Sequence, residues 1–532
     1  MRNKQKIMEN SYRDNYYGSI LDPIHGDIKL SEIEKWIISH PLFNRLRKVK
    51  QNTFLYYVFP SANHTRFEHS IGVMHIAGKI FDACKENFAT GDKKNQKYND
   101  GKPSSFFDLR KLDKFEEIYY QELRIAALLH DIGHGPLSHL FDIFLMDREN
   151  FFKLIEANNI VKEYYNSFDA ICKEKVEHEQ ISCVFVFKIL NDLLTANDTN
   201  ENKFSDSAKD MIKNLSIERV VKLIEPMFEL KNEGFVDDEN NDYINFFSRI
   251  ITAFPIDSDR MDYLLRDSYF SGVNYGFYDI NRIFASFMAT NDENFINLTF
   301  KGSGIDSMLR FIQSRTHLYN QVYFHKTNRA ANTMLEAATR TKKENKTKLL
   351  NNISKIDDLQ SFYVNNSDEY FINETVKNEI STSELEQKIL EDLKSRKLFK
   401  RVYEQKVILT PSNFQKKEKI EELVKEISSK LKTLESDSIF SYVDKYKNET
   451  FKDSEGDKAI KIATKNKDGK YDINKKWETL NQEFINSNIN SYMVRVYLRR
   501  TFHSSEEFKG MRDKILDLIK IECEELEKLE TK

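Results

Sequence analysis

Apolar side chains recur at helical spacing through the first part of the chain. Ile33, Trp36 and Ile37 repeat every three to four positions within residues 19–85, which places them on one face of a helix. Further helices are predicted over residues 69–80, 115–141, 249–270 and 305–341. Polar runs at 91–105 and 195–210 predict surface loops, and the alternation in 295–302 predicts a short strand.

The pattern changes beyond about residue 345, where KKENKTKLLNN suggests a boundary. Residues 419–435 predict an amphipathic helix whose apolar face is formed by Ile420, Leu423, Val424, Ile427, Leu431 and Leu434. Residues 494–502 are a strand candidate. We therefore predict an N-terminal extension (1–18), a helical domain (19–345) and a C-terminal lobe (346–532) for oligomerisation or regulation.

Composition supports a large, mainly α protein. The 532 residues include 40% hydrophobic and 31% charged residues but only 16 Gly and 8 Pro, which disfavours a turn-rich β fold. A net charge of −3 gives little attraction for nucleic acid. The 4 cysteines form no CxxC pair, and neither a secretion signal nor a membrane-spanning run is evident, so we expect a cytoplasmic protein.

The strongest chemical signal follows the apolar run at 125–129. His130 and Asp131 come directly after it, with His134 and His139 close behind and glycines between them. A buried His–Asp pair needs compensation, and the glycines allow backbone or ligand to approach closely. Imidazole and carboxylate together suit Fe, Mn or Zn, among which spacing cannot choose.

Two distant segments offer the remaining metal ligands. His69 lies in NHTRFEHSIGVMH, which also holds His64 and His75. Asp259 lies in PIDSDRMDYLLRD, which holds four acids. Each segment alone is more typical of a solvated face, but their order around His130–Asp131 favours one site.

This H…HD…D order is the signature of the HD phosphohydrolase superfamily, and the flanking sequence resembles the deoxynucleoside triphosphate (dNTP) triphosphohydrolases. The resemblance runs from about residue 18 to 345. Because it begins so early in the chain, we expect no sterile-alpha-motif domain before residue 18. The matching segments are 22–30, 43–51, 56–73, 130–139, 177–182, 257–267 and 322–327, with a weaker echo at 395–402.

The resemblance implies a mainly α fold, namely a helical HD core with a short β-hairpin and a C-terminal α+β lobe. It implies metal ligation by His69, His130, Asp131 and Asp259. His134 and His139 resemble residues that line the α-phosphate, and His178 with Glu179 resembles the acid–base pair. The implied reaction attacks the α-phosphorus and releases a deoxynucleoside and triphosphate.

The substrate contacts are also implied by resemblance. A triphosphate with about four negative charges attracts cations, and Arg66, Arg260 and Arg315 match the family's phosphate contacts, with Mg²⁺ expected on the phosphates. Gln51, Asn52, Tyr263, Asp267 and Tyr323 match positions near the sugar.

Several departures from the family bear on selectivity and regulation. Asn52–Thr53 stands where an apolar residue faces the sugar, and Phe324 replaces a polar residue near the base. Gly18 and Ser39 replace a Lys and an Asp that bind an activating guanine nucleotide, although Arg47 is retained. We therefore expect activation by GTP in that form to be absent, while another nucleotide activator stays open.

Two other functions remain open from the sequence. One is an HD phosphodiesterase or nuclease acting on single-stranded nucleic acid or a cyclic nucleotide. The other is an oligomeric protein that senses nucleotides without turnover. Such a sensor does not need the acid–base set of His134, His139, His178 and Glu179. The family resemblance further suggests a homo-oligomer (a dimer of dimers or a hexamer) and, by analogy alone, a role in antiphage nucleotide depletion.

Overall fold

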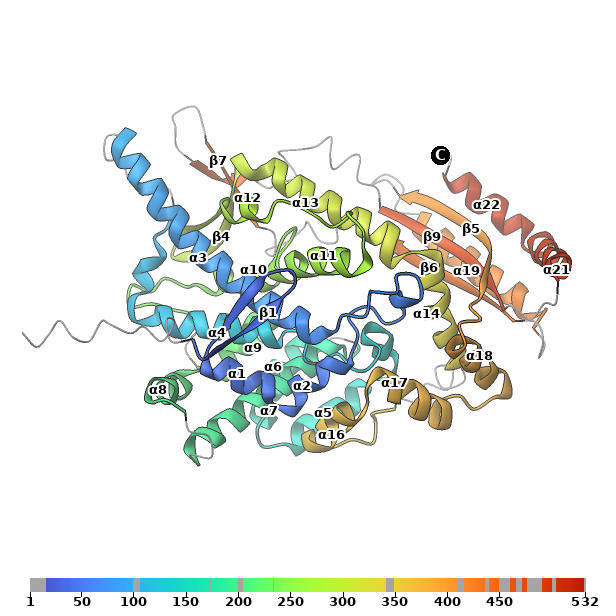
Figure 1. Ribbon diagram of the computed structural model, residues 1–532, viewed down its shortest axis with the longest axis horizontal. Coiled ribbons are helices and arrows are strands. Elements are labelled where there is room, and N and C mark those ends of the chain that lie inside the picture. The colour runs from blue at the N-terminus through green and yellow to red at the C-terminus, as the bar shows by residue number, and fades with distance from the viewer. Residues whose placement is uncertain are drawn as a thin grey trace, which may run out of the picture.

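The computed structural model describes residues 16–98, 106–172, 174–199, 204–232, 234–340, 349–409, 416–435, 440–448, 460–465, 471–475, 490–499 and 504–530. The protein is mainly α-helical, as the sequence predicts, and the described residues form three small sheets. Figure 1 shows a larger, mainly helical body and a sheet-containing lobe at one end. No described helix has the length and apolar character needed to cross a membrane.

A β-hairpin lies near the start of the described residues, where apolar spacing predicts a helix, and a short β-hairpin agrees with what the family resemblance implies. Strand β1 (Gly18–Asp22) pairs antiparallel with β2 (Gly26–Leu30). Asp22 accepts hydrogen bonds from the N–H groups of Ile24 and His25, which folds the turn, and Gly26 closes it with a φ of 74°. The turn chemistry therefore outweighs the weak helical spacing.

Helices of the HD-like part follow in sequence. They are α1 (Glu32–Ser39), α2 (Pro41–Asn44), α3 (Arg66–Tyr98), α4 (Glu116–Leu129), α5 (Arg148–Ala157), α6 (Tyr165–Ile171), α7 (His178–Asp198), α8 (Asp206–Asn214), α9 (Ile217–Ile224), α10 (Ile244–Ile251), α11 (Ser258–Ser271), α12 (Ile280–Phe284), α13 (Ile305–Leu318) and α14 (Lys326–Ala338). Buried ion pairs join some of them; Arg124 of α4 binds Glu34 of α1, and Arg219 of α9 binds Glu122 of α4.

Several predicted boundaries are wrong. Helix α3 continues to Tyr98, so the predicted loop at 91–105 is helical in its first part, and residues 99–105 lie outside the described residues. Helices α7 and α8 extend into the predicted loop at 195–210. Polar residues are tolerated in a solvated helix, and extending a helix costs far less than starting one.

Two predicted helices are each divided. The segment 249–270 contains the end of α10 and most of α11, with Pro255 in the break between them. The segment 305–341 contains α13, a π-helical turn (Tyr319–Tyr323) and α14. The strand predicted at 295–302 is confirmed as β4 (Phe295–Lys301), which pairs with β3 (Phe287–Asp292).

The main core continues past the predicted boundary at residue 345. Helices α16 (Ile356–Asn365), α17 (Asp368–Tyr370) and α18 (Glu384–Lys394) follow, with a π-helical segment (Phe371–Ile380). Their buried side chains, such as Tyr363, Phe371 and Ile389, belong to the same hydrophobic cluster as the HD-like helices. Residues 341–348 lie outside the described residues, and the domain division stays a prediction.

A second hydrophobic core defines the lobe at the C-terminal end (Figure 1). Its sheet has the order β5–β9–β6 and is formed by β5 (Lys400–Leu409), β6 (Ser441–Asn448) and β9 (Asn490–Leu498). Helices α19 (Lys416–Lys432), α21 (Ser505–Leu518) and α22 (Lys520–Glu530) pack with it. The amphipathic helix predicted at 419–435 is α19, although Leu434 lies beyond its end.

The strand predicted at 494–502 is confirmed in part as β9, which begins at Asn490 and ends at Leu498. Two further strands, β7 (Lys461–Lys465) and β8 (Tyr471–Lys475), return to the HD-like part. There, β7 pairs parallel with β4 and completes a sheet of order β3–β4–β7–β8. The chain after residue 345 therefore contributes to both parts of the molecule.

The turn after α4 is packed against the start of α7. A Cβ atom at Gly133 would lie 2.0 Å from the carbonyl oxygen of His178 and 2.4 Å from the nitrogen of Ser182. The Gly133 N–H donates to Ser182 Oγ over 2.8 Å, and this hydroxyl donates to the His130 carbonyl over 2.9 Å. Only glycine allows this approach of the two backbones.

We expect Gly133→Ala to lower the free energy of unfolding by about 1–3 kcal/mol, because the new methyl group meets backbone atoms that cannot rotate away. Gly510→Ala is the control, since Gly510 lies in α21 and a Cβ added there would meet nothing within 4 Å. Alanine at that helical position stabilises by up to about 1 kcal/mol. Urea unfolding of both variants measures the difference. Wild-type stability of the Gly133 variant would contradict this packing.

Candidate active site

Three helices bring four predicted metal ligands together. His69 comes from α3, His130 and Asp131 directly follow α4, and Asp259 lies in the first turn of α11. His69 Nε2 lies 3.1 Å from Asp259 Oδ1 and 3.7 Å from Asp131 Oδ2. His130 Nε2 lies 3.5 Å from Asp131 Oδ1 and 3.7 Å from Asp259 Oδ1.

These separations, from 3.1 to 3.7 Å, are at or slightly above those of donor atoms that share a divalent metal ion. Ligand bonds of about 2.1 Å at tetrahedral or octahedral angles place donor atoms about 3.0–3.4 Å apart. The Nε2 atoms of His69 and His130 are buried and make no hydrogen bond among the described residues. Their Nδ1 atoms are engaged, at 2.8 Å from Asp262 Oδ2 and 2.8 Å from the Ala127 carbonyl. Such outer contacts orient imidazole ligands toward a metal.

Asp262 is the centre of this supporting layer. It is completely buried on α11, and Oδ1 lies 2.7 Å from His25 Nε2 of the hairpin turn. Arg266, one helical turn later, donates to both carboxylate oxygens and also to Asp22. Burial raises the pKa of Asp262, but the Arg266 charge and the imidazole contacts outweigh this and hold it well below its ordinary value.

The cluster of metal-ligand candidates is strongly polarised. Burial lowers the pKa of His69, but the nearby carboxylates of Asp259 and Asp262 raise it to about 10. Burial raises the pKa of Asp131, whereas the charges of His130 and Arg66 hold it well below its ordinary value. Asp131 and Asp259 thus remain ionised beside the imidazoles of His69 and His130. This donor set attracts a divalent cation.

A cavity of about 520 Å³ opens onto this cluster, a size within the range of small-molecule sites. Its walls contain every predicted site residue except His69, which is completely buried beside it. The predicted site residues that line the cavity are Gln51, Asn52, Arg66, His130, Asp131, His134, His139, His178, Glu179, Asp259, Arg260, Tyr263, Asp267, Arg315 and Tyr323. The structure therefore brings together residues that span more than half of the chain.

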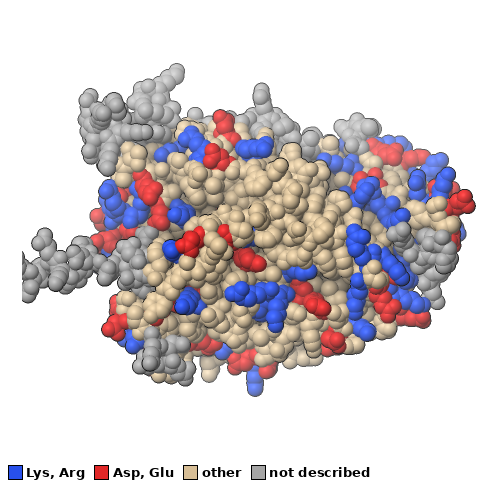
Figure 2. All heavy atoms as spheres, in the orientation of Figure 1, with Lys and Arg blue, Asp and Glu red and all other residues tan. Residues whose placement is uncertain are grey.

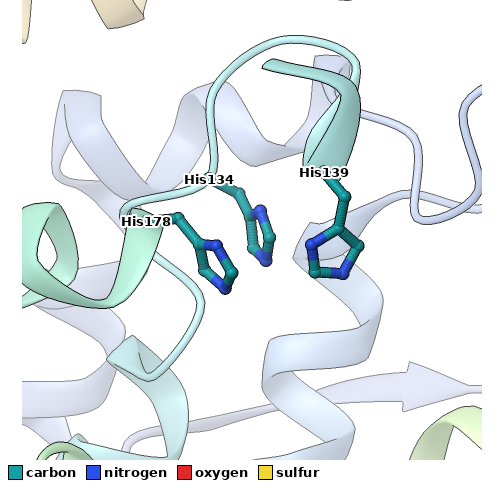
Figure 3. Close-up of side chains that lie close together, drawn as sticks. All are labelled: His134, His139 and His178. Atoms are coloured by element: carbon teal, nitrogen blue, oxygen red, sulfur yellow. The ribbon is translucent and has the colours of Figure 1, made fainter. Parts of the chain in front are cut away.

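Three histidines form a second cluster in the cavity. Figure 3 shows His134 and His178 side by side, with His139 facing them from the following turn. The rings of His134 and His178 are stacked at 3.6 Å and 20°, whereas His139 meets both rings edge-on. Their nitrogen atoms are close enough to share a metal ion. However, the lone pairs of stacked imidazoles run nearly parallel, so this cluster suits proton transfer or anion binding better.

Two carboxylates flank the three histidines. His178 Nε2 lies 3.4 Å from Glu179 Oε1, and its Nδ1 lies 3.6 Å from Asp142 Oδ1. The other oxygen of Asp142 lies 3.7 Å from His139 Nδ1. Burial lowers the pKa of His178, but Asp142 and Glu179 raise it above its ordinary value. In contrast, burial and the nearby charge of Arg66 hold the pKa of His134 well below its ordinary value.

The predicted phosphate-binding arginines already have protein partners. Arg66 binds the metal-ligand candidate Asp131 and donates from Nε to Ser138 Oγ over 2.9 Å. Arg260 binds Asp257 and the Ala253 carbonyl, and Arg315 lies over the ring of Tyr319 at 4.4 Å. These contacts fix three cations along the cavity wall before any anion binds.

The predicted sugar contacts are linked to one another. Tyr323 donates to Asp267 Oδ2, while Asp267 Oδ1 lies 2.6 Å from His64 Nε2. Among the described residues, Gln51 Oε1 and Asn52 Nδ2 are buried without a hydrogen-bond partner. These two amides offer an acceptor and a donor at the cavity.

Sequence reasoning missed His25, Asp142 and Asp262, which support the site from behind. Asp262 lies three residues after Asp259, a spacing that puts both acids on one face of α11. Asp142 lies three residues after His139, and His25 lies inside the first matched segment. Helical spacing from Asp259 and His139 points to Asp262 and Asp142. Only the fold brings His25 to α11.

Charge on the face shown in Figure 2 is mixed. Lysine and arginine alternate with aspartate and glutamate around a broad region without charged side chains. Basic side chains of the described residues on this face therefore lie beside acidic ones.

Family models match two parts of the chain. The HD domain model matches residues 66–264, which contain all four metal-ligand candidates. The model of an HD associated region matches residues 278–457. The chain therefore contains an HD domain and is similar to dNTPases.

Relatives of this HD-domain protein include uncharacterized and named proteins. An uncharacterized protein of Methanocaldococcus jannaschii is 29% identical over 340 residues, covering 64% of this chain and 53% of the relative. Human deoxynucleoside triphosphate triphosphohydrolase SAMHD1 is 26% identical over 336 residues, covering 60% of this chain and 44% of the relative. The matched region is thus only about half of these curated relatives.

The fold also resembles a solved structure. A hypothetical protein from Aquifex aeolicus aligns with a TM-score of 0.57 and 23% identity, covering 94% of this chain and 99% of the other. The two proteins therefore share a fold that includes most of the C-terminal part of this chain.

We expect His130→Ala to weaken binding of Mn²⁺ or Fe²⁺ by roughly 100-fold or more, since losing even an outer contact of a metal ligand costs about 10–100-fold. His317→Ala is the control, because His317 is exposed on α13. Metal content after dialysis against a chelator gives the comparison. Equal metal retention by both variants would show that the metal is held elsewhere.

Proposed function

We propose that the protein is a metal-dependent dNTP triphosphohydrolase that releases a deoxynucleoside and triphosphate. The HD domain and the similarity to dNTPases support a hydrolase. The observation that carries the finer proposal is one cavity that holds a metal-ligand cluster, an acid–base histidine and three arginines. This combination suits cleavage of an ester of a highly charged phosphate chain.

Each group has a place in the reaction. A water molecule attacks the α-phosphorus, the bond from this phosphorus to the 5′ oxygen breaks, and the 5′ oxygen leaves with a proton. When bound, a divalent cation at the His69–Asp259 cluster polarises the phosphoryl group and lowers the pKa of water. His178 holds a proton for the leaving oxygen because its carboxylate neighbours raise its pKa.

The remaining residues bind and orient the substrate. Arg260 and Arg315 face the phosphate chain, which brings Mg²⁺ with it, while Arg66 keeps Asp131 in place. Asp267 and Tyr323 face the sugar as one hydrogen-bonded unit. In this arrangement the metal is Fe, Mn or Zn.

Regulation and assembly remain predictions from the family resemblance. Gly18 begins β1 and Ser39 ends α1, so neither supplies the charge that binds a guanine nucleotide in the family. Arg47 lies against the ring of Phe67 at 3.4 Å. Activation by another nucleotide, a homo-oligomer, a cytoplasmic location and a role in antiviral nucleotide depletion all stay predictions.

The first experiment incubates the metal-loaded protein with each dNTP, each NTP and single-stranded DNA, singly and in mixtures, and identifies the products by mass spectrometry. We expect triphosphate and deoxynucleosides, with at least about a 1000-fold loss of rate in Asp131→Ala and none in His317→Ala. Monophosphate with pyrophosphate, or shortened DNA, would instead support the phosphodiesterase or nuclease alternative. Binding without any product would support the nucleotide-sensing alternative.

The pH dependence of kcat tests the role of His178 as the proton donor. Because Asp142 raises the pKa of His178, the protonated imidazole persists to higher pH in the wild type. Asp142→Asn removes that charge, lowers the pKa of His178 and shifts the alkaline limb of the kcat profile to lower pH. Asp358→Asn, at an exposed position on α16, is the control. An unmoved alkaline limb would exclude His178 as the proton donor.

A further inference from the structure

A buried acid from the C-terminal part reaches two loops of the cavity. Asp368 begins the short helix α17, well beyond the matched HD domain, and is 8% exposed. Its Oδ2 accepts the N–H of Lys50 over 2.9 Å, and its Oδ1 accepts the N–H of Leu137 over 2.7 Å. One carboxylate therefore joins the backbone just before Gln51 to the backbone just before Ser138 and His139.

The second of these loops has an unfavourable backbone conformation. Leu137 and Ser138 have φ angles of 65° and 55°, in the left-handed region that side chains with a Cβ disfavour. Such a conformation persists only where its surroundings hold it in place. Here the Leu137 N–H is held by Asp368, and its carbonyl accepts from Thr53 Oγ1 over 2.8 Å.

The two loops are also joined directly. Ser138 Oγ donates to the Lys50 carbonyl over 2.7 Å and accepts from Arg66 Nε over 2.9 Å. Because Arg66 binds the metal-ligand candidate Asp131, these contacts run without a gap from Asp368 to the metal cluster. A shift of either loop would therefore move residues on both sides of the cavity.

The ionised form of Asp368 suits this arrangement. Both oxygens must accept, which only the carboxylate does without a proton in the way. Burial raises its pKa to about 6, even though the two N–H groups and the charges of Lys50 and Arg66 lower it, so the group is ionised at neutral pH. The structure thus keeps a buried charge where a neutral side chain would be easier to bury.

We propose that Asp368 is a positioning residue, which holds the loops of Gln51 and His139 at the separation that the substrate requires. The inference rests on the proposed function of the cavity, since Asp368 itself does not line it. It assigns to the C-terminal part a direct role in forming the active site.

The test compares Asp368→Asn with Asp358→Asn, the exposed acid of α16, in the full-length, metal-loaded protein. Asparagine keeps one acceptor but turns an NH₂ group toward the other backbone N–H. We expect kcat to fall by roughly 10–100-fold, as a displacement of about 1 Å can produce, with unchanged metal content. Hydrogen exchange should become faster in peptides that cover Lys50 and Leu137, and the control should match the wild type.

A merely structural role would lower the melting temperature without changing kcat of the folded fraction. A folded Asp368→Asn variant with kcat within about twofold of the wild type, or with both amides still protected, would overturn the proposal. If this variant does not fold, Thr53→Val removes the opposite contact to Leu137, and an unchanged kcat there would overturn it equally. If the wild type hydrolyses no dNTP, the proposed function fails, while hydrogen exchange alone still decides whether Asp368 holds the two loops.

Discussion

The completely buried carboxylate of Asp262 is the interaction on which the site depends. It binds His69 of α3, His25 of the β1–β2 hairpin and Arg266 of its own helix. A carboxylate without water is costly unless such partners compensate it, so removing one partner leaves the others uncompensated. The same contacts that stabilise this charge also set the direction of the His69 ring. Asp262 therefore links the position of the hairpin to the orientation of a metal-ligand candidate.

The C-terminal lobe supports the wall of a cavity that the HD-like part lines. Phe324 and Arg329, which line it, contact the C-terminal lobe, where Phe324 stacks on Tyr446 at 4.1 Å and Arg329 binds Asp444 of β6. Arg495 of β9 donates to the Phe324 carbonyl over 2.8 Å. Strand β7, which also follows residue 345, pairs with β4 of the HD-like part, and β4 contacts α10. The lobe is therefore in direct contact with residues of the cavity wall.

The sequence predicts the helical class and the residues around the cavity well, because both depend on local signals. Apolar spacing reveals α4 and α19, and the order of His69, His130, Asp131 and Asp259 marks one site. Helix ends at Tyr98 and Asp198 were missed because polar residues suit a solvated helix as well as a loop. Contacts such as His25 to Asp262 span 237 positions, and no local pattern encodes them.

Two groups of histidines share one cavity, and their surroundings separate their chemistry. In the first, the Nδ1 atoms of His69 and His130 are engaged behind the site, so both Nε2 atoms face the same two carboxylates. In the second, the rings are stacked, and carboxylates at their edges raise the pKa of His178 while burial lowers that of His134. Converging lone pairs suit a metal ion, whereas a protonated ring beside a neutral one suits proton transfer. Direction and local charge, which residue type and spacing do not specify, thus distinguish a ligand from an acid.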